Sequence, residues 1–185
     1  IFWNAAKKRG PNTWLRQKKF GIWQIWTWNQ AAQIVKDIAN GLIALGFNPQ
    51  ETASVLSNTK AEWVFVDLAI LSAGGVSNGI YPTDSSDQVQ YLCEDSTTTI
   101  LFVEDDEQLD KALDVRQRLP HLRKIVVEDL EGLRSFEDPQ VISLEELQKI
   151  GRDYGAKNSD ALDTRLKGIN PEDLAILIYT SGTTG

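Results

Sequence analysis

Residues 53–80 read ASVLSNTKAEWVFVDLAILSAGGVSNGI, and this stretch decides the fold class. It opens and closes with short runs at 53–57 and 76–80 that hold β-branched or aliphatic residues, as is typical of strands covered on both faces. Between them, Thr59 and Glu62 have the spacing of a capping box that opens a helix. A strand, a helix and a second strand in this order indicate a right-handed crossover between parallel strands.

The same alternation continues along the chain. Three more strands are predicted from apolar runs at residues 99–103, 124–127 and 174–179. Three more helices are predicted behind capping boxes that begin at Thr27, Ser85 and Ser143. The first of these helices ends at Gly46, a residue that suits a left-handed stop. We therefore expect an α/β fold with a mostly parallel sheet and helices on both faces.

Two segments depart from this alternation. Residues 13–19 and 22–28 flank Phe20 and Gly21 and predict a β-hairpin that leads into the first long helix. Residues 132–173 are polar and rich in turn-forming residues, and they predict a long connection into the last strand. Short helical patches are expected within this connection at residues 143–150 and 159–167.

Composition and charge limit the class of protein. With 185 residues, 42% of them apolar, the chain can bury the core of one sizeable domain. The net charge of −7 argues against a sequence-independent nucleic-acid binder. The charge is uneven, because residues 1–50 hold seven Lys or Arg and one acid, whereas the remainder holds twelve bases and twenty-five acids. An anionic partner would therefore meet the N-terminal part first.

Single occurrences of cysteine and histidine exclude several kinds of site. Cys93 is the only cysteine, which rules out an intrachain disulfide and a thiolate-rich metal centre, and we interpret it as a small buried hydrophobe. His121, also alone, is expected in a surface turn. The most apolar stretch, residues 63–76, is interrupted by Asp67 and two glycines. It is too short and too polar to span a bilayer, so no transmembrane helix is expected.

The predicted strand at 174–179 runs into TSGTTG, a loop built from Ser, Thr and Gly. In open parallel sheets, ligands bind beyond the carboxyl ends of the strands. Such a loop offers accessible backbone amides and four hydroxyl groups, and a polyphosphate needs several donors of this kind at once. Two alternatives stay open on composition alone, namely an ordinary turn and a Walker A loop beginning at Gly182.

Residues 177–185, LIYTSGTTG, resemble the first half of the AMP-binding signature of the adenylate-forming superfamily. WTWNQ at 26–30 and LSAGGVSNGIYPT at 71–83 are similar to two further motifs of that superfamily and occur in the same order. Residues 80–89 and 101–111 resemble long-chain fatty acyl-CoA synthetases. Asn78-Gly79 departs from the pattern, since many relatives carry an apolar residue and a proline there. We interpret this departure as backbone geometry at a strand end.

The resemblance implies that residues 1–185 are part of the large N-terminal domain of an adenylate-forming enzyme. The implied activity is ATP-dependent activation of a long-chain fatty acid to acyl-adenylate and then acyl-CoA, with release of pyrophosphate and AMP. It implies ATP and Mg²⁺ as cofactors and coenzyme A as co-substrate. The residues implied to hold the ATP phosphates are Thr180, Ser181, Gly182, Thr183, Thr184 and Gly185.

The resemblance also sets expectations about the extent of the chain. It contains no Met and stops within the implied phosphate loop, so we expect a fragment that lacks the C-terminal domain. The catalytic residues are expected beyond Gly185, and the fragment alone is expected to be inactive. Another adenylate-forming ligase, specific for medium-chain or aryl acids or for loading a carrier protein, stays an alternative, as does a non-catalytic nucleotide-binding protein. A cytoplasmic location is expected.

The remaining charged and aromatic clusters have two interpretations each. The basic, Trp-rich start suits the edge of an anionic membrane, whereas Trp23, Trp26 and Trp28 also suit core and helix-start contacts. The acidic run at 104–107 suits a cation site less well than a solvated helix start. A carboxylate pair that could act in catalysis is conceivable near residues 81–83, but spacing favours ordinary capping and exposure of the acids there, namely Asp84, Asp87, Glu94 and Asp95.

Overall fold

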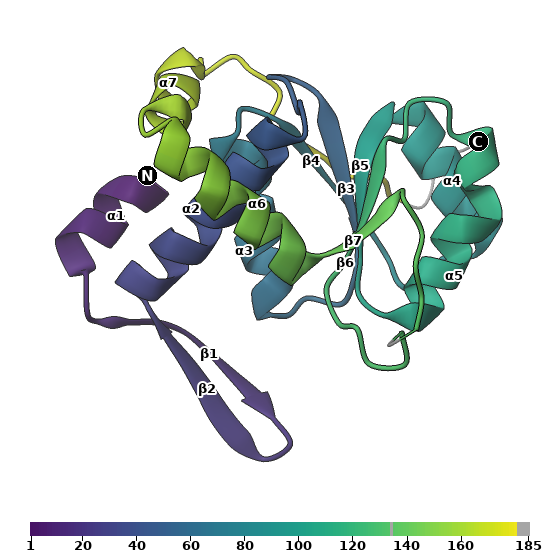
Figure 1. The fold of residues 1–185 in the computed structure, drawn as a ribbon, viewed down its shortest axis with the longest axis horizontal. Coiled ribbons are helices and arrows are strands. Elements are labelled where there is room, and N and C mark those ends of the chain that lie inside the picture. The colour runs from purple at the N-terminus through teal and green to yellow at the C-terminus, as the bar shows by residue number, and fades with distance from the viewer. Residues whose placement is uncertain (134, 181–185) are drawn as a thin grey trace.

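The computed structural model describes residues 1–133 and 135–180, and Figure 1 shows its fold. A two-stranded hairpin precedes a six-stranded sheet of order β7-β6-β5-β3-β4-β8, in which all pairs of strands are parallel. The strands are β1 (Thr13–Lys19), β2 (Ile22–Thr27), β3 (Thr52–Leu56), β4 (Val76–Ile80), β5 (Thr98–Val103), β6 (Lys124–Val127), β7 (Val141–Ser143) and β8 (Ile176–Leu177). The helices are α1 (Phe2–Arg9), α2 (Trp28–Ala44), α3 (Ala61–Ser72), α4 (Ser86–Asp95), α5 (Asp106–Val115), the 3-10 turn η1 (Arg116–Arg118), α6 (Leu144–Lys157) and α7 (Ala161–Gly168).

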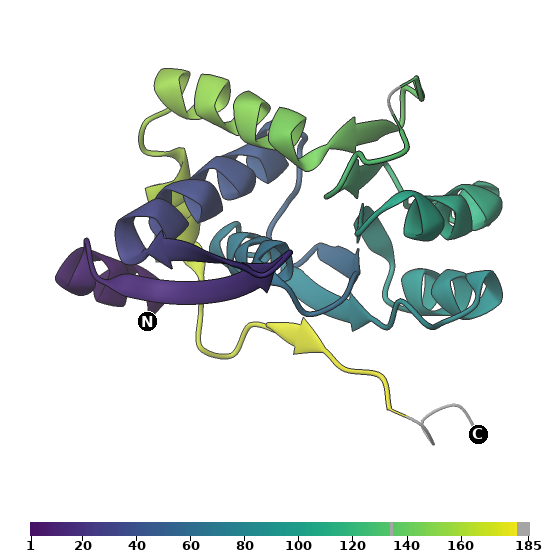
Figure 2. The same ribbon diagram turned by 90° about the horizontal axis from the view of Figure 1, so that it is seen from below.

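Helices cover both faces of the sheet, which confirms the predicted fold class. α2, α3 and α6 lie on one face, and α4 and α5 lie on the other (Figures 1 and 2). Successive residues of β5 point to opposite faces, as the pleat requires. Ile100 and Phe102 belong to the core under α2 and α3, whereas Leu101 and Val103 belong to the core under α4 and α5. All four side chains are fully buried, as expected for a central parallel strand.

Two of the predicted capping boxes are complete, and at a third helix only the Ser143 half is present. Thr27 and Ser85 each exchange hydrogen bonds with a Gln three residues on, at the starts of α2 and α4. Ser143 accepts from the backbone N–H of Glu146 (3.0 Å) at the start of α6. Gly46 follows α2 with a φ of 79°, the left-handed geometry that was expected.

The predicted capping box at Thr59 is wrong. α3 begins at Ala61 and its N-cap is Lys60, which makes no side-chain capping bond. The backbone N–H of Ala61 instead donates to Oε1 of Gln17 in β1 (2.6 Å). A side chain from the hairpin therefore satisfies one of the free amides at the start of α3.

The prediction of the last strand also needs correction. The run at 174–179 was expected to form one buried strand, but β8 covers only Ile176–Leu177 at the edge of the sheet. Ile176 is 45% and Ile178 is 72% exposed. The reason is that β4 alone pairs with β8 within the described part of the chain, so the outward-facing aliphatic side chains remain uncovered.

The N-terminal segment and the long connection hold elements that the sequence pattern did not predict. α1 precedes the hairpin, where no helix was expected, and its apolar residues Phe2 and Trp3 pack against the main core. β7 adds an edge strand, and α6 extends to Lys157, beyond the predicted patch at 143–150, whereas α7 confirms the patch predicted at 159–167. None of the helices in the described ranges combines the length and apolarity needed to cross a membrane.

Candidate functional site

The carboxyl edge of the parallel sheet is the place where the topology positions a ligand site. β3 leads into α3 on one face, whereas its neighbours β4 and β5 lead into α4 and α5 on the opposite face (Figure 1). The loops that follow adjacent strands therefore diverge at this edge, and such a divergence marks the binding crevice of open α/β sheets. The predicted phosphate loop begins at this edge too, because β8 runs parallel to β4.

The stem of the predicted phosphate loop is fixed at both of its ends. Before β8, the Gln50 side chain accepts from the N–H of Leu174 (3.2 Å) and donates to its carbonyl oxygen (3.5 Å). After β8, the hydroxyl of Tyr179 donates to Oδ2 of Asp95, the last residue of α4 (2.5 Å). The Tyr179 ring also packs against the core under α4 and α5. These contacts hold the chain just before Thr180, the first residue of the loop.

Tyr179 and Asp95 form an ordered donor and acceptor pair. Burial comes first among the causes that raise the pKa of the Tyr179 hydroxyl, and the hydrogen bond to Asp95 and its negative charge add to it. The phenol therefore remains a proton donor at neutral pH. Thr180 is exposed at the end of this stem. Ser181, Gly182, Thr183, Thr184 and Gly185 lie outside the described residues, so their assignment to ATP phosphates stays a prediction.

A cluster of ionisable side chains lies farther along the same edge, directly behind β3, β5 and β6. Lys60 places its Nζ 3.2 Å from Oε2 of Glu128 and 3.5 Å from Oε1 of Glu104. Ser57 donates its hydroxyl to Oε2 of Glu128 (3.0 Å). Asn58 donates both its backbone N–H (2.7 Å) and its side-chain amide (2.8 Å) to Glu104. The cluster ties together the ends of three neighbouring strands.

The two glutamates of this cluster have opposite pKa shifts. The side chain of Glu128 is fully buried, and this burial raises its pKa to about 7 even though Lys60 acts in the other direction. Burial also acts to raise the pKa of Glu104, but hydrogen bonds from Asn58 and the charge of Lys60 outweigh it and lower that pKa. Oε1 of Glu128 is buried without a hydrogen-bond partner among the described residues. Of the two glutamates in this cluster, Glu128 is therefore the one that is more easily protonated near neutral pH.

A buried polar network crosses the middle of the sheet and corrects the interpretation of Asn78. The Asn78 side chain is fully buried inside β4, and its amide donates to the hydroxyls of Ser54 (2.9 Å) and Ser96 (3.3 Å). Thr98 lies 2.5 Å from Ser54 and 2.7 Å from Ser96, oxygen to oxygen. Asn78 is thus part of a hydroxyl and amide network at mid-strand rather than a feature of strand-end geometry. The side-chain oxygen of Asn78 is buried without a hydrogen-bond partner among the described residues, so the network is only partly satisfied.

The other residues that the sequence singled out have ordinary structural roles. Cys93 is 1% exposed and burial raises its pKa to about 12, so it is a buried, unreactive thiol. His121 is exposed in a turn, as predicted. In the acidic run, Asp105 caps α5 by accepting from the N–H of Gln108 (3.1 Å). Within residues 1–133 and 135–180, no group of three or more His, Cys, Asp or Glu side chains could hold a metal ion.

The four acids that flank residues 81–83 do not form a catalytic pair. Asp87 forms an ion pair with Arg118 (3.3 Å), and Glu94 accepts from the side chain of Gln90 (3.0 Å). Asp95 accepts from Tyr179 instead of sharing a proton with another carboxylate. The interpretation of these residues as capping and exposed groups is therefore supported for Asp87 and Glu94, whereas Asp95 has the additional contact to the loop stem.

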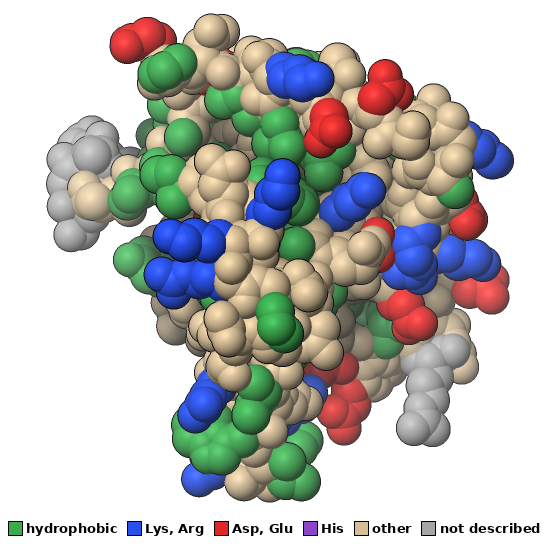
Figure 3. All heavy atoms as spheres, turned by 90° about the vertical axis from the view of Figure 1, so that its left-hand side faces the viewer, with side chains coloured by type: hydrophobic (Ala, Val, Ile, Leu, Met, Phe, Trp, Pro, Cys, Tyr) green, Lys and Arg blue, Asp and Glu red, His purple; other side chains and the backbone are tan. Residues whose placement is uncertain are grey.

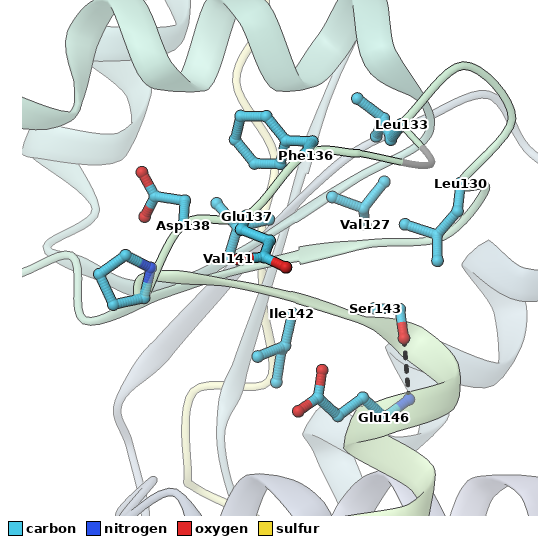
Figure 4. Close-up of a pocket in the computed structure, with 11 residues that line it drawn as sticks. Val127, Leu130, Leu133, Phe136, Glu137, Asp138, Val141, Ile142, Ser143 and Glu146 are labelled. Atoms are coloured by element: carbon cyan, nitrogen blue, oxygen red, sulfur yellow. Dashed lines mark hydrogen bonds between the residues drawn. The ribbon is translucent and has the colours of Figure 1, made fainter.

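A cavity of about 740 Å³ lies beneath the loop that joins β6 to β7, and Val127 and Ser143 at the carboxyl ends of these two strands line it (Figure 4). Its walls include Val127, Leu133 and Phe136, and its rim carries the acids Glu137 and Glu146. An apolar hollow with an acidic rim repels a triphosphate. This cavity therefore does not compete with the end of β8 as a nucleotide site.

Sequence reasoning missed four residues that shape the carboxyl edge: Gln17, Gln50, Lys60 and Glu128. The only local signal was for Glu128, because a carboxylate directly after a buried strand lies at the ligand-binding edge of a parallel sheet. The other three act through partners that are distant in the sequence, and their spacing gives no indication of this.

An all-parallel sheet, covered by helices on both faces and followed by a Ser/Thr/Gly sequence after an edge strand, defines an α/β protein of the class in which ligands bind at the carboxyl edge of the sheet. The family model of the AMP-binding enzyme matches residues 2–185, and the chain belongs to this family. This result confirms the resemblance that the sequence motifs indicated.

Two relatives and one solved structure illustrate the family. The long-chain-fatty-acid–CoA ligase ACSBG1 of Rattus norvegicus is 30% identical over 191 residues, which cover 100% of this chain and 25% of that protein. The long-chain-fatty-acid–CoA ligase FadD15 of Mycobacterium bovis is 33% identical over 165 residues, which cover 89% of this chain and 26% of that protein. The present chain thus spans about a quarter of the length of these relatives.

The solved structure is that of the anthranilate CoA ligase AuaEII in complex with anthranoyl-AMP. It superimposes with a TM-score of 0.80 at 23% sequence identity and covers 100% of this chain and 32% of that chain. At this identity the likeness concerns the fold. The chain therefore shares its fold with this solved structure, in agreement with the family match.

Proposed function

We propose that the protein activates a long-chain fatty acid with ATP and transfers the acyl group to coenzyme A. The observation that carries this proposal is the LIYTSGTTG sequence at 177–185, whose stem leaves the carboxyl edge of the sheet beside β4. Membership of the AMP-binding enzyme family supports it. The names of ACSBG1 and FadD15 support the choice of a long-chain fatty acid.

The proposed reaction has two steps. The fatty acid carboxylate attacks the α-phosphate of ATP, forming an acyl-adenylate and releasing pyrophosphate. The thiol of coenzyme A then attacks the acyl carbonyl and AMP leaves. The first step requires positioning and charge stabilisation more than covalent chemistry from the protein. We assign no catalytic residue among residues 1–180. The catalytic residues are proposed to lie beyond Gly185.

The loop that begins at Thr180 is proposed to bind the β- and γ-phosphates. Its glycines let backbone amides approach the oxygens, and its hydroxyls supply further donors. The residues proposed for this role are Thr180, Ser181, Gly182, Thr183, Thr184 and Gly185. Mg²⁺ would arrive with ATP as the counter-ion of its phosphates, and no described side chain is assigned to it. The buried single cysteine suits the reducing cytoplasm, where we propose that the reaction takes place.

The test uses the complete gene product, purified and supplied with ATP, Mg²⁺, coenzyme A and one carboxylic acid at a time. We expect AMP, pyrophosphate and acyl-CoA to form in equal amounts with C14–C18 fatty acids. A preference for a medium-chain or aryl acid would show that the protein is an acyl-CoA ligase with a different acid substrate, and it would overturn the long-chain assignment. Nucleotide binding without pyrophosphate release from any acid would overturn the enzymatic proposal.

The assignment of the loop is tested separately with Thr180→Ala and Thr183→Ala. Loss of one hydroxyl that binds a phosphate oxygen is expected to raise the KM for ATP about tenfold, since a charge-assisted hydrogen bond contributes roughly 1.5–3 kcal/mol. Ser159→Ala, at an exposed position before α7, is the matched control and should leave the KM unchanged. If all three variants had the same KM for ATP as the wild type, the loop would not be the phosphate-binding site.

A further inference from the structure

The hairpin of β1 and β2 has an anchored base and an exposed tip. At the base, the rings of Trp14 and Trp26 pack against Phe65 of α3, with centroid distances of 5.8 and 5.7 Å. The tip extends away from the sheet and the helices (Figure 1). Its large apolar side chains are exposed: Phe20 by 90%, Ile22 by 71%, Trp23 by 59% and Ile25 by 49%. The expected core contact of Trp23 is therefore absent, whereas Trp26 packs against the core as expected.

The turn at the tip adopts a backbone geometry that disfavours an aromatic residue. Phe20 and Gly21 join the paired residues Lys19 and Ile22, and their φ angles are 49° and 80°. Two-residue hairpin turns with positive φ favour Asn or Gly, because a Cβ is strained in the left-handed region. Phe20 therefore carries a conformational cost and gains almost no burial within the described residues. A contact outside these residues would offset that cost.

Basic side chains surround the exposed tip. Lys18 places its Nζ 5.8 Å from the ring centroid of Trp23, and Lys19 lies 5.9 Å from that of Phe20. Lys19 also forms an exposed ion pair with the carboxylate of Asp129 (3.7 Å). Residues 1–36 contain seven Lys or Arg and no acid. Figure 3 shows hydrophobic and basic side chains together at the lower end of the molecule, where the hairpin lies.

We propose that residues 18–25 dock onto an anionic phospholipid membrane. Phe20, Ile22 and Trp23 enter the headgroup layer, and Lys18 and Lys19 contact the lipid phosphates. Aromatic and aliphatic side chains beside lysines have the polarity of this interface, and positive charge is attracted to an anionic leaflet. Two hairpin tips would repel each other through their equal charge, so pairing with a second tip is disfavoured. The proposal does not depend on the enzymatic activity proposed above.

The experiment is vesicle co-sedimentation of the complete gene product. Vesicles contain either phosphatidylcholine alone or phosphatidylcholine with 30% phosphatidylglycerol. We expect binding to the anionic vesicles, weakened at high salt as the Debye length falls. Phe20→Ser with Trp23→Ser should lower the partition coefficient at least about tenfold, because two apolar side chains are removed. Lys18→Gln with Lys19→Gln should lower it by about fivefold per lysine.

Matched controls separate the hairpin from general charge and folding effects. Lys149→Gln with Lys157→Gln removes the same charge from exposed positions on α6 and should leave binding nearly unchanged. Trp23→Phe keeps an apolar ring but should remove most of the tryptophan quenching by brominated lipids, and this readout does not require the double variant to fold. Absence of binding to the anionic vesicles would overturn the proposal. Unchanged binding of the hairpin variants would overturn it too. The proposal would also be overturned if the hairpin substitutions changed the oligomeric state of the protein and not its binding to vesicles.

Discussion

At the residue scale, the carboxyl edge of the sheet depends on Glu128. Its side chain is fully buried behind β6, where one carboxylate oxygen contacts Ser57 and Lys60 and the other has no partner among the described residues. A buried charge with one unsatisfied oxygen is costly, and protonation relieves this cost. The predicted response is therefore a dependence of folding stability on pH near neutrality.

We predict that stability falls as the pH rises from 5 to 8. The pKa of Glu128 is about 7 in the folded protein against an ordinary value of 4.5, so the folded state holds this proton more tightly than the unfolded state. The stabilisation is complete below the unfolded pKa and is lost as the pH rises through the folded pKa. The loss should amount to at most roughly 3 kcal/mol. Thermal unfolding midpoints across this pH range measure it.

Glu128→Gln is the diagnostic variant, because glutamine keeps the shape and cannot ionise. It should flatten the pH dependence between pH 5 and 8, while Lys60 keeps its ion pair with Glu104. Glu107→Gln is the control, since Glu107 is a surface partner of Lys111 with a 75% exposed side chain. If Glu128→Gln retains the slope of the wild type, another group causes it.

The contact between Tyr179 and Asp95 gives a second prediction at this scale, which rests on the proposed ATP reaction. Asp95 lies at the C-terminal end of α4, where the helix dipole disfavours a negative charge, and the Tyr179 hydroxyl donates to it. Removal of the hydroxyl in Tyr179→Phe frees the stem of the phosphate loop. We expect the KM for ATP to rise about tenfold, the equivalent of one charge-assisted hydrogen bond.

Steady-state kinetics of the complete gene product measure this effect. Asp95→Asn keeps an acceptor oxygen and should impair the enzyme less than Asp95→Ala. Tyr154→Phe removes the hydroxyl of a half-buried tyrosine from α6 and should be neutral. A Tyr179→Phe enzyme with an unchanged KM and an unchanged kcat would show that this contact does not position the loop.

Local residue roles were predictable from the sequence and distant ones were not. Thr27 and Ser85 cap helices through partners three residues away, so their roles follow from spacing alone. Gln17 caps α3 across 44 positions, and Ser57 contacts Glu128 across 71. Such pairs exist only after the sheet and the hairpin have formed, which is why the capping box at Thr59 was predicted wrongly.

At the element scale, the closest packing joins α2 and α6. Gly41 and Gly151 face each other's helix, and an added Cβ at Gly151 would overlap the carbonyl of Asp37. Arg152 and Asp37 add an ion pair across the same pair of helices (3.3 Å). The two backbones therefore approach so closely that only glycine fits.

We predict that Gly151→Ala destabilises the protein by about 1–3 kcal/mol or more, because two helix backbones must move apart. The matched control is Gly168→Ala in α7, where a Cβ meets no atom within 4 Å. This control should be neutral or stabilise by up to about 1 kcal/mol through helix propensity. Unfolding midpoints of the two variants decide the matter, and equal midpoints would contradict the close packing of α2 and α6.

The sequence predicted the buried strands correctly and the exposed edge strand incorrectly. The runs at 76–80 and 124–127 match β4 and β6, since strands that are buried on both faces are rich in β-branched and aliphatic residues, with the buried Ser77 and Asn78 of β4 as polar exceptions. The run at 174–179 has the same composition, yet β8 is short and mostly exposed at the sheet edge. The apolar composition of a run indicates that its side chains favour burial. Whether the strand is buried depends on the number of strands that pair with it, which the run itself does not show.

At the scale of the whole molecule, charge and apolar surface are distributed unequally. The basic hairpin and α1 lie at the N-terminal end, whereas the acids are concentrated after residue 50. The sequence alone indicated this asymmetry, but it could not show that apolar side chains gather at the hairpin tip. A second apolar region surrounds β8, where Leu174, Ile176 and Ile178 are 50%, 45% and 72% exposed.

The exposed edge at β8 leads to a prediction for the isolated 185-residue chain. β8 pairs with β4 on one side only within the described residues, and an unpaired apolar edge promotes strand pairing between molecules. We predict concentration-dependent association of the isolated chain, measured by sedimentation velocity. Ile178→Lys should reduce it, because a lysine on an edge disfavours pairing, whereas Ile169→Lys, a 39% exposed position after α7, should have little effect. A monomeric isolated chain with a cooperative unfolding transition would show that the edge at β8 does not drive association.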